Sequence, residues 1–378
     1  MTVERTSPNI GDYARITQAL NPLEFEIPIT QQQSDYFPDF LEQRINRYTD
    51  YFKTYLKPNT DDLTNYTDGA TDVLTNKITA LGSGLIKAVQ CYYEGEILKA
   101  TEVFNKTLND LDHAGISLYE HISENENFYR TRPSADKRLK RPDLFHNPYQ
   151  NRNIVATSRY SIPGLPALYL GNSVYVCWEE YDRRNINQLY FSRFSNQKKL
   201  KVIKIYRLDD LQKDLGPVHP LLQNTYLLRY MALFPLFIAC SVRTKEAGTF
   251  KPEYIIPQLL LQYITQDEEV DGIMFPSTKV DYTKIDGVGA YNYVFPVKKT
   301  AKAGFCSDLV TNFQMTEPTS IELETLLSYA NPVIRDSSFV NPIPGNLSLF
   351  EGENHLYLRT AFGRLEETLL KRPLAPVE

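Results

Sequence analysis

The first third of the chain carries apolar side chains at the spacing of amphipathic helices. Three stripes repeat at intervals of three and four residues, namely Phe37, Leu41, Ile45, Tyr48, Phe52 and Tyr55, then Leu74, Ile78, Leu81 and Leu85, then Ile97, Ala100, Phe104, Leu108 and Leu111. The dipeptide Lys57-Pro58 ends the first stripe, because the residue before a proline avoids helical backbone angles. The pattern predicts a helical unit over residues 35–118, after an irregular segment over residues 1–33.

From about residue 121 the pattern changes to short apolar runs separated by proline, glycine and asparagine. Runs of this length are typical of strands in a mixed domain. The expected strands cover residues 167–170, 200–206, 270–277 and 291–296. Two longer apolar segments predict buried helices at residues 221–242 and 254–264, and we expect Pro235 to break the first of them. The fold class predicted from this order is α/β, of the α+β type.

The tail of the chain predicts two further helices. Thr319 and Glu322 form a capping-box pattern for the first, and an apolar stripe marks the second at Leu358, Phe362, Leu365 and Leu369. We therefore expect three segments. They are a helical N-terminal region over residues 1–120, a core domain over residues 121–300 and a C-terminal extension over residues 301–378.

Residues 158–180 form the most informative stretch of the core domain. Pro163-Gly164 suits a tight turn, because proline fixes φ and glycine permits a positive φ. A short apolar strand follows, and Gly171-Asn172-Ser173 then ends the strand and caps a helix. On that helix Ser173, Cys177 and Glu180 share a face of small side chains. Glu180 is therefore placed to meet a ligand that lies against the helix.

Length and charge narrow the classes of partner. The chain has 378 residues and a net charge of -5 at pH 7, so it can bury a sizeable core in two or three domains. A pI near 5.7 gives no long-range attraction for nucleic acid or an anionic membrane. The N-terminus lacks the residue order of a signal peptide, and the longest apolar run, residues 231–242, is too short to span a bilayer. We expect a soluble, cytoplasmic protein.

The reactive residue types exclude several chemistries. The four cysteines lie far apart without a CxxC pair, which argues against a disulfide framework or a zinc ribbon and fits a reducing compartment. The histidines show no metal-ligand spacing, and no GxSxG, P-loop or GxGxxG motif occurs, so no metal is expected. Arginine, tyrosine, glutamate and serine remain. Arginine grips phosphate, aromatic rings stack on bases, and a carboxylate stabilises a sugar oxocarbenium ion. Together they suit a dinucleotide that is cleaved at a glycosidic bond.

The core domain resembles the RES-domain family, which is named for its Arg, Glu and Ser positions. The residues that carry the resemblance are Arg130, Arg159, Tyr160, Tyr169, Glu180 and Ser277. Tyr169 lies ten residues after Arg159 and eleven before Glu180, as the family pattern requires. Residues 271–277 (DGIMFPS) resemble the serine motif of the family, and residues 292–295 (NYVF) resemble the strand that follows it. The resemblance covers roughly residues 121–300.

Two positions depart from the family pattern. Tyr160 stands where a tryptophan is usual, and Glu179-Glu180 stands where one acid is typical. Both the spacing and the helix face favour Glu180 as the acid of the family pattern.

The resemblance implies an ADP-ribosyltransferase-like fold and cleavage of NAD as the substrate. It also implies a role as the toxin of a toxin–antitoxin pair, whose partner is a helix-turn-helix antitoxin. It assigns catalysis to Glu180, Arg159 and Ser277, and NAD binding to Arg130, Tyr160 and Tyr169. In this assignment the arginines hold the pyrophosphate or ribose, and Tyr169 stacks near the nicotinamide. Glu180 stabilises the oxocarbenium ion or orients the attacking group, and Ser277 hydrogen-bonds the ribose or phosphate.

Three functions stay open at this stage. The first is an enzyme that breaks the nicotinamide–ribose bond with water or phosphate as the acceptor. The second is a transferase that moves ADP-ribose onto a macromolecule. The third is an inactive RES-like scaffold whose helical region binds a partner protein. Taken singly, each site residue also fits a surface ion pair, a core position or a turn. The joint spacing favours the site, and a homo-oligomer is compatible with the sequence.

Overall fold

The computed structural model describes residues 25–32, 35–60, 70–113, 116–134, 137–215, 220–244, 248–330, 345–350 and 352–377. Residues 1–24 of the expected irregular segment lie outside this description. The chain divides into two compact units. The helical unit consists of residues 1–118, 158–160 and 204–263, and the sheet unit consists of residues 119–157, 161–203 and 264–378.

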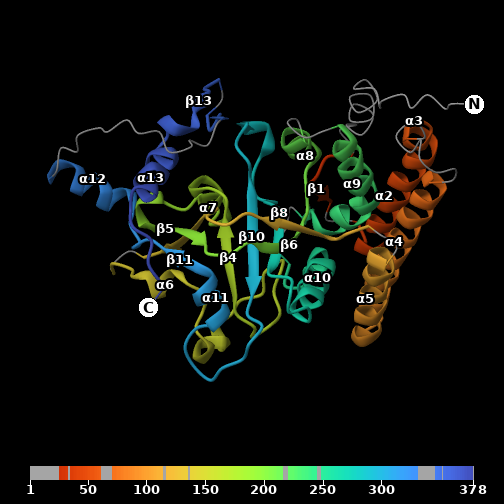
Figure 1. Cartoon of the computed structure of the whole chain (residues 1–378), viewed down its shortest axis with the longest axis horizontal. Helices are drawn as coiled ribbons and strands as arrows, with labels where there is room; N and C mark the ends of the chain where they lie inside the picture. The colour runs from red at the N-terminus through yellow and green to blue at the C-terminus, as the bar shows by residue number, and fades with distance from the viewer. Residues whose placement is uncertain are drawn as a thin grey trace, which may run out of the picture. The chain divides into compact units, whose positions relative to one another are not determined.

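Helices make up most of the helical unit (Figure 1). They are α2 (Phe37–Tyr51), α3 (Lys57–Thr60), α4 (Ala70–Tyr93), α5 (Ile97–His113), α8 (Leu208–Leu215), α9 (Pro220–Cys240) and α10 (Ile255–Thr265), with a π-helical turn at Phe52–Leu56. A small parallel sheet pairs β1 (Ile29–Gln31) with β7 (Val242–Thr244). The three apolar stripes are confirmed as the buried faces of α2, α4 and α5, except that Tyr55 and Ile97 are exposed.

The predicted break at Pro235 is wrong, because α9 runs through that proline without interruption. A proline inside a helix removes one backbone hydrogen bond. This helix is apolar on every side and residues 230–240 are all buried, where α9 packs on α2 and α4. Burial on this scale outweighs the missing hydrogen bond, so tertiary packing decides the conformation.

The predicted α+β class is confirmed by an eight-stranded sheet with helices packed on it. The strand order is β11-β5-β3-β4-β10-β8-β6-β2. In chain order the strands are β2 (Tyr119–Ile122), β3 (Asn127–Pro133), β4 (Ala167–Gly171), β5 (Leu189–Asn196), β6 (Leu200–Lys204), β8 (Gly272–Pro276), β10 (Tyr291–Pro296) and β11 (Phe313–Met315). The four expected strands appear as β4, β6, β8 and β10.

The sheet is split between β3 and β4. The register joins these two strands at one residue pair, Tyr129 opposite Gly171. On its other side β3 pairs with β5 over its whole length, and β4 likewise pairs with β10. The sheet therefore has a half made of β11, β5 and β3 and a half made of β4, β10, β8, β6 and β2. Beyond the single pair, the facing edges of β3 and β4 do not pair with each other.

The C-terminal residues belong to the sheet unit. The strand β11 extends the large sheet at its edge, and α13 packs against α7. The helices of this unit are α6 (Arg141–Leu144), α7 (Val174–Glu180), α11 (Ser307–Asn312), α12 (Ile321–Ala330) and α13 (Ala361–Leu370). A three-stranded sheet joins β9 (Ile285–Asp286), β12 (Asn346–Leu347) and β13 (His355–Leu356). No helix in the described ranges combines the length and apolar character needed to cross a bilayer.

The compact units and the three expected segments have different boundaries. Residues 204–263 join the N-terminal helices, because α9 packs on α2 and α4. The C-terminal extension joins the core domain through β11 and α13. The expected capping box also differs in detail, because the hydroxyl of Ser320, and not Thr319, accepts the amide hydrogen of Leu323 at 3.1 Å. The two tail helices themselves are confirmed as α12 and α13.

One buried carboxyl joins α13 to α7. Glu366 lies on α13 with 3% of its surface exposed. Its Oε1 accepts hydrogen bonds from the backbone N–H of Val174 at 2.6 Å and the hydroxyl of Tyr357 at 2.5 Å. Burial raises the pKa of Glu366 to about 8, against the lowering effect of these two hydrogen bonds. Burial dominates because the charged form of an acid loses its hydration inside the protein.

Replacing Glu366 by glutamine is expected to flatten the pH dependence of stability. Below pH 4.5 the carboxyl is protonated in the folded and unfolded states alike, whereas between 4.5 and about 8 only the folded state holds the proton. Raising the pH through this window therefore favours unfolding, by up to about 1.4 kcal/mol per pH unit. Urea titrations followed by fluorescence of Trp178, the single tryptophan, measure the slope.

The matched control is Glu322→Gln at an exposed position, which is expected to keep the slope of the parent protein. Equal slopes for the parent protein and Glu366→Gln over this window would contradict the assignment of the raised pKa to Glu366.

Candidate active site

The expected order of turn, strand and helix in residues 158–180 is confirmed. The amide of Leu165 donates to the carbonyl of Ile162 at 2.9 Å, across a turn in which Gly164 has a φ of +74°. The strand β4 follows, and α7 begins at Val174. The hydroxyl of Ser173 caps α7 by accepting the amide hydrogen of Val176 at 3.1 Å. These local contacts place Glu180 at the last residue of the helix.

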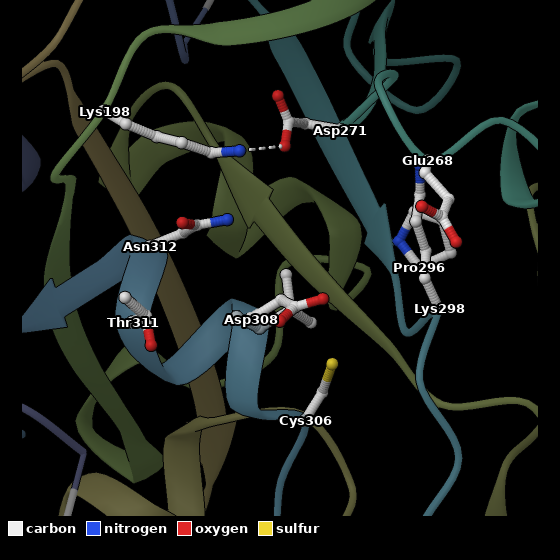
Figure 2. A pocket seen from close by; sticks show the side chains of 10 residues that line it. Lys198, Glu268, Asp271, Pro296, Lys298, Cys306, Asp308, Thr311 and Asn312 are labelled. Atoms are coloured by element: carbon white, nitrogen blue, oxygen red, sulfur yellow. Dashed lines mark ion pairs between the residues drawn. The ribbon is translucent and has the colours of Figure 1, made fainter.

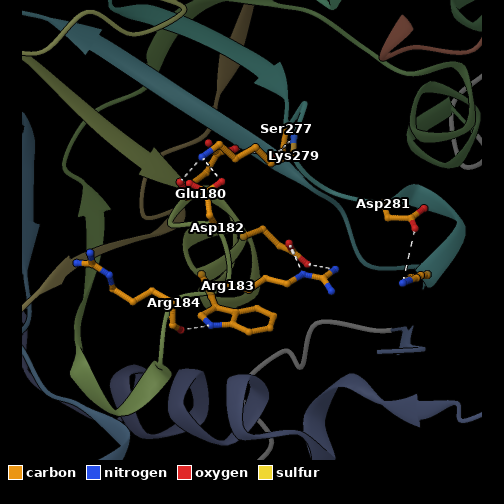
Figure 3. A network of polar contacts seen from close by, with 10 residues as sticks. Glu180, Asp182, Arg183, Arg184, Ser277, Lys279 and Asp281 are labelled. Carbon is orange, nitrogen blue, oxygen red and sulfur yellow. Dashed lines mark hydrogen bonds and ion pairs between the residues drawn. The ribbon is translucent and has the colours of Figure 1, made fainter. Parts of the chain in front are cut away.

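Two long-range hydrogen bonds hold the Glu180 carboxylate. Its Oε1 accepts from Ser277 Oγ and from Asn292 Nδ2, each at 2.6 Å. Ser277 follows β8, and Asn292 lies on β10, so three elements that are distant in sequence meet at one oxygen. Figure 3 shows Glu180 and Ser277 in this network. Among the described residues neither bond reaches Oε2. Glu180 is half-buried, and Oε2 is therefore the oxygen that a ligand would meet.

The backbone around Ser277 fixes the direction of its hydroxyl. Ser277 has no exposed surface, and its amide donates to the carbonyl of Ala290 at 2.8 Å. Its Oγ accepts the amide hydrogen of Lys279 at 3.2 Å, which directs the hydroxyl hydrogen to Glu180. The hydroxyl of Tyr282 donates to the carbonyls of Ser277 and Ala290, each at 3.0 Å. Ser277 is thus a rigid donor that orients the carboxylate.

Asn292 was not among the predicted site residues. Its partner on β4 is Gly171, and its partner on β8 is Phe275. An asparagine at the start of a buried strand is an available sequence signal, because a buried amide needs hydrogen-bond partners. The identity of its partner depends on the register of the sheet, which local patterns do not show.

The structure separates the two neighbouring acids. Glu179 is 3% exposed, and Arg183 binds both of its oxygens at 2.9 Å in a forked pair. Such a pair occupies the carboxylate fully. Figure 3 shows Glu180 turned away from Arg183, and among the described residues both of its side-chain hydrogen bonds are made by Oε1. This arrangement leaves Glu180, and not Glu179, with an oxygen that can meet a ligand, and the choice of Glu180 as the catalytic acid stays a prediction.

The turn after α7 has unusual backbone angles. Asp182 and Arg183 have φ of 53° and 56°, in the left-handed region that non-glycine residues rarely occupy. Four contacts of this turn offset the strain. Arg183 binds Glu179, and its guanidinium lies 5.6 Å from the ring centre of Trp178. Lys279 donates to Asp182 at 2.8 Å and to the carbonyl of Glu180 at 2.7 Å. Strained backbone of this kind is common beside functional residues.

Arg130 lies where the sheet splits. It extends from β3 and donates from Nη1 to the carbonyl of Tyr169 on β4 at 3.1 Å. Within the described residues this is its one hydrogen bond, and no carboxylate pairs with it. Burial, assisted by the positive charge of Arg132, lowers the pKa of Arg130 to about 10. The side chain stays charged at neutral pH, and a half-buried cation of this kind suits an anionic ligand.

The charges of Arg130 and Glu180 both affect the pKa of the Cys177 thiol. Burial is the main cause that raises the pKa of this thiol, and the charges of Glu180 and Arg130 shift it in opposite directions. The thiol donates to the carbonyl of Tyr129 at 3.2 Å, which ties α7 to β3 next to the split. The cation and the acid are therefore both close enough to influence one buried residue of α7.

Arg159 and Tyr160 belong to the helical unit, whereas the other four predicted site residues belong to the sheet unit. Arg159 donates to the carbonyl of Glu253 at 3.4 Å, and its guanidinium lies 5.0 Å from the ring centre of Tyr254. Tyr160 has no exposed surface and lies beside the thiol of Cys240. Complete burial favours a packing role for Tyr160 within its own unit.

A separate pocket of about 230 Å³ opens on the sheet unit (Figure 2). Its charged side chains are largely paired: Lys198 binds Asp271 at 2.9 Å, and Asp308 binds Lys299 at 2.7 Å. Lys298 donates to the carbonyls of Asp267 and Val270. None of the predicted site residues lines this pocket, and its internal pairing leaves little charge for a ligand.

One group of side chains has the composition of a metal site. Cys91, Glu94 and Glu96 bring ligand atoms within 4.8 Å of one another in the helical unit. Lys99 already binds Glu96 at 2.6 Å. Exposed carboxylates that pair with lysine are common without a metal, and we assign none here.

The comparison with known proteins finds one relative of high similarity. The "Putative toxin YopC" of Bacillus subtilis (strain 168) is 34% identical over 313 residues, which cover 78% of this chain and 69% of the relative. No protein-family model matches the chain. A search of solved structures also finds no match.

The two acids are expected to differ in their effect on stability. Glu179→Ala leaves Arg183 without its partner and removes two charge-assisted hydrogen bonds, so we expect a loss of about 1–3 kcal/mol. Glu180→Ala removes a half-buried carboxylate that forms no ion pair among the described residues, and water in its place can accept from Ser277 and Asn292. We therefore expect a loss below about 1 kcal/mol. Urea unfolding followed by Trp178 fluorescence measures both, and a larger loss for Glu180→Ala would overturn the assignment.

Proposed function

We propose that this chain, which belongs to the family of the "Putative toxin YopC" of Bacillus subtilis, is a toxin. We propose further that it cleaves NAD between the nicotinamide and the ribose. The name of the relative supports the toxin role. The NAD chemistry rests on the side chains of the sheet unit and on the resemblance to RES-domain proteins.

The observation that carries the proposal is the hydrogen bonding of the Glu180 carboxylate. Ser277 and Asn292 hold its Oε1, and the described residues leave Oε2 without a hydrogen bond. A carboxylate oriented in advance stabilises a developing positive charge without rearrangement of its surroundings. The transition state for loss of nicotinamide carries such a charge on the ribose ring. Glu180 is proposed to face that ring.

The anionic part of NAD requires a cation, and Arg130 supplies it in this proposal. It lies in the split of the sheet, half-buried and without a carboxylate partner among the described residues. Its forked donors suit the pyrophosphate. Tyr169, whose carbonyl accepts from Arg130, is proposed to stack near the nicotinamide. The split itself is consistent with an ADP-ribosyltransferase-like fold, which we also propose.

The proposed reaction is a substitution at C1′ of the nicotinamide ribose. The bond from C1′ to the ring nitrogen breaks, and its electron pair leaves with nicotinamide, whose positive charge is thereby neutralised. Water or phosphate then bonds to C1′, and water releases one proton in doing so. In this scheme Ser277 and Asn292 orient Glu180.

A toxin with this activity needs restraint in the cell that makes it. We therefore propose a protein inhibitor, of the helix-turn-helix class that the RES resemblance implies. Transfer of ADP-ribose onto a macromolecule, and a scaffold without catalysis, are alternative outcomes of the assay below.

Purified protein is expected to release nicotinamide from NAD, and Glu180→Ala is expected to lower kcat by about 10²–10³. The expected change in KM is small, because the carboxylate acts on the charge that develops in the transition state. The control is Glu322→Ala at an exposed position, which should match the parent protein. Chromatography of free nicotinamide, with and without added phosphate or protein acceptors, measures the rate.

The outcomes separate the three functions. Turnover without an acceptor indicates hydrolysis, turnover that requires phosphate indicates phosphorolysis, and turnover that requires a protein indicates transfer. If Glu180→Ala is as fast as the parent protein, the active-site assignment is wrong. If the parent protein consumes no NAD under any of these conditions, the enzyme proposal fails.

Arg130→Ala is expected to raise KM for NAD by about tenfold or more, because a lost hydrogen bond to a charged group costs about 1.5–3 kcal/mol. Nicotinamide riboside carries no phosphate and provides the comparison within one variant. Its turnover should change little in Arg130→Ala if the arginine binds the pyrophosphate. Equal losses with both substrates would show a structural role for Arg130.

A further inference from the structure

The described part of the C-terminal extension touches two of the three elements that meet at the Glu180 carboxylate. Its first contact is with α7, the helix that ends at Glu180. Glu366 on α13 accepts the amide hydrogen of Val174, the first residue of α7, at 2.6 Å. This amide is one of the free donors at a helix N-terminus. A residue from the far end of the chain therefore helps to cap the helix that presents the acid.

The second contact is with the loop that carries Ser277. This loop, residues 277–290, contains β9, and β9 pairs with β12 of the extension. The register places Asn346 opposite Asp286 and Leu347 opposite Ile285. Gly345 packs so closely here that an added Cβ would lie 2.4 Å from the carbonyl oxygen of Asp286. The extension thus braces the loop as well as the helix.

One apolar cluster joins these two contacts. It contains Leu347, Tyr357 and Phe362 from the extension together with Cys177 from α7 and Val288 from the loop. All five are at most 5% exposed. Close-packed side chains of this kind transmit a displacement instead of absorbing it. A shift of α13 would therefore move α7 against the loop.

A buried arginine anchors α13 to the large sheet. Arg193 on β5 donates from Nε to the carbonyl of Leu369 and from Nη2 to the carbonyl of Arg372, each at 3.1 Å. Its Nη1 donates to Asn127 Oδ1 on β3 at 2.9 Å. The C-terminal end of α13 is thereby fixed to the same half of the sheet that carries Arg130.

We infer that the C-terminal extension sets the position of Glu180 against Ser277, and that Glu366 is the positioning residue that acts through the N-terminus of α7. The inference rests on the proposed function for its catalytic consequence, although the bracing itself is independent of it. Positioning errors near 1 Å can cost about 100-fold in rate. Loss of the Glu366 contact is therefore expected to lower kcat more than it changes KM.

The experiment compares Glu366→Leu with Glu366→Gln in the full chain. Glutamine keeps an oxygen that accepts from Val174 and Tyr357, whereas leucine removes the acceptor and keeps the bulk. We expect Glu366→Leu to lower kcat for nicotinamide release by about 10-fold to 100-fold, with KM within about threefold. Glu366→Gln is expected to keep at least about a third of the parent kcat, because the contact survives.

The matched control is Leu200→Ala, a buried truncation on β6. This strand lies outside the extension, and Leu200 is not part of the cluster that joins α13 to α7. The variant is expected to destabilise the same unit by about 2–5 kcal/mol and to retain the parent kcat below its unfolding temperature. If Leu200→Ala and Glu366→Leu lower kcat equally, general destabilisation explains the loss and the inference fails. If Glu366→Leu folds and keeps the parent kcat, the inference also fails.

Hydrogen exchange separates this inference from the proposed function. In Glu366→Leu the amides of residues 176–180 should exchange at least tenfold faster than in the parent protein, while those of α5 stay unchanged. Unchanged exchange in α7 would show that the extension does not hold this helix in position, even if the protein consumes NAD. A parent protein without NAD turnover would overturn the proposed function, and the exchange result would then decide the bracing alone. If Glu366→Leu does not fold, Gly345→Ala tests the other contact, with a fall in kcat expected and an unchanged kcat overturning the inference.

Discussion

The two halves of the large sheet are joined at one residue pair, Tyr129 opposite Gly171, and the site is built around that joint. A side chain at Gly171 would place a Cβ 3.0 Å from the sulfur of Cys177, so glycine allows α7 to begin close to the end of β4. Beyond the joint, where β3 and β4 do not pair, Arg130 donates to the carbonyl of Tyr169. Asn292, which lies opposite Gly171, then reaches Glu180. Arg130, Glu180 and Asn292 are thus all held by elements that meet at or next to this one residue pair.

Burial and pairing separate three carboxyl groups in the sheet unit. Glu179 is buried and fully paired with Arg183, which fits a structural role. Glu180 is half-buried and held at one oxygen, which fits contact with a ligand. Glu366 is buried without a cation among the described residues, and its pKa is raised to about 8. At neutral pH it caps α7 mostly in its neutral form, which avoids the cost of a buried charge.

The order of the chain and the order of the fold differ. The helical unit takes residues from three separate stretches, and so does the sheet unit. The sheet unit is completed from the C-terminal end, where β11 and α13 close its edge and one face. The C-terminal extension, which the sequence pattern separates from the core domain, is therefore part of the framework of the proposed active site. Its contacts with α7 and with the Ser277 loop give it a direct physical route to the acid.

The sequence by itself determined what depends on near neighbours along the chain. The helical stripes, the Pro163-Gly164 turn, the strand β4 and the Ser173 cap all arise from contacts within about four residues. Tertiary structure alone decided that Asn292 meets Glu180, that α9 continues through Pro235, and that Glu366 caps α7. These contacts join residues that are far apart in the sequence, so they depend on sheet register and on burial in the folded chain. Local sequence patterns show neither the register of the sheet nor the burial of a residue in the folded chain.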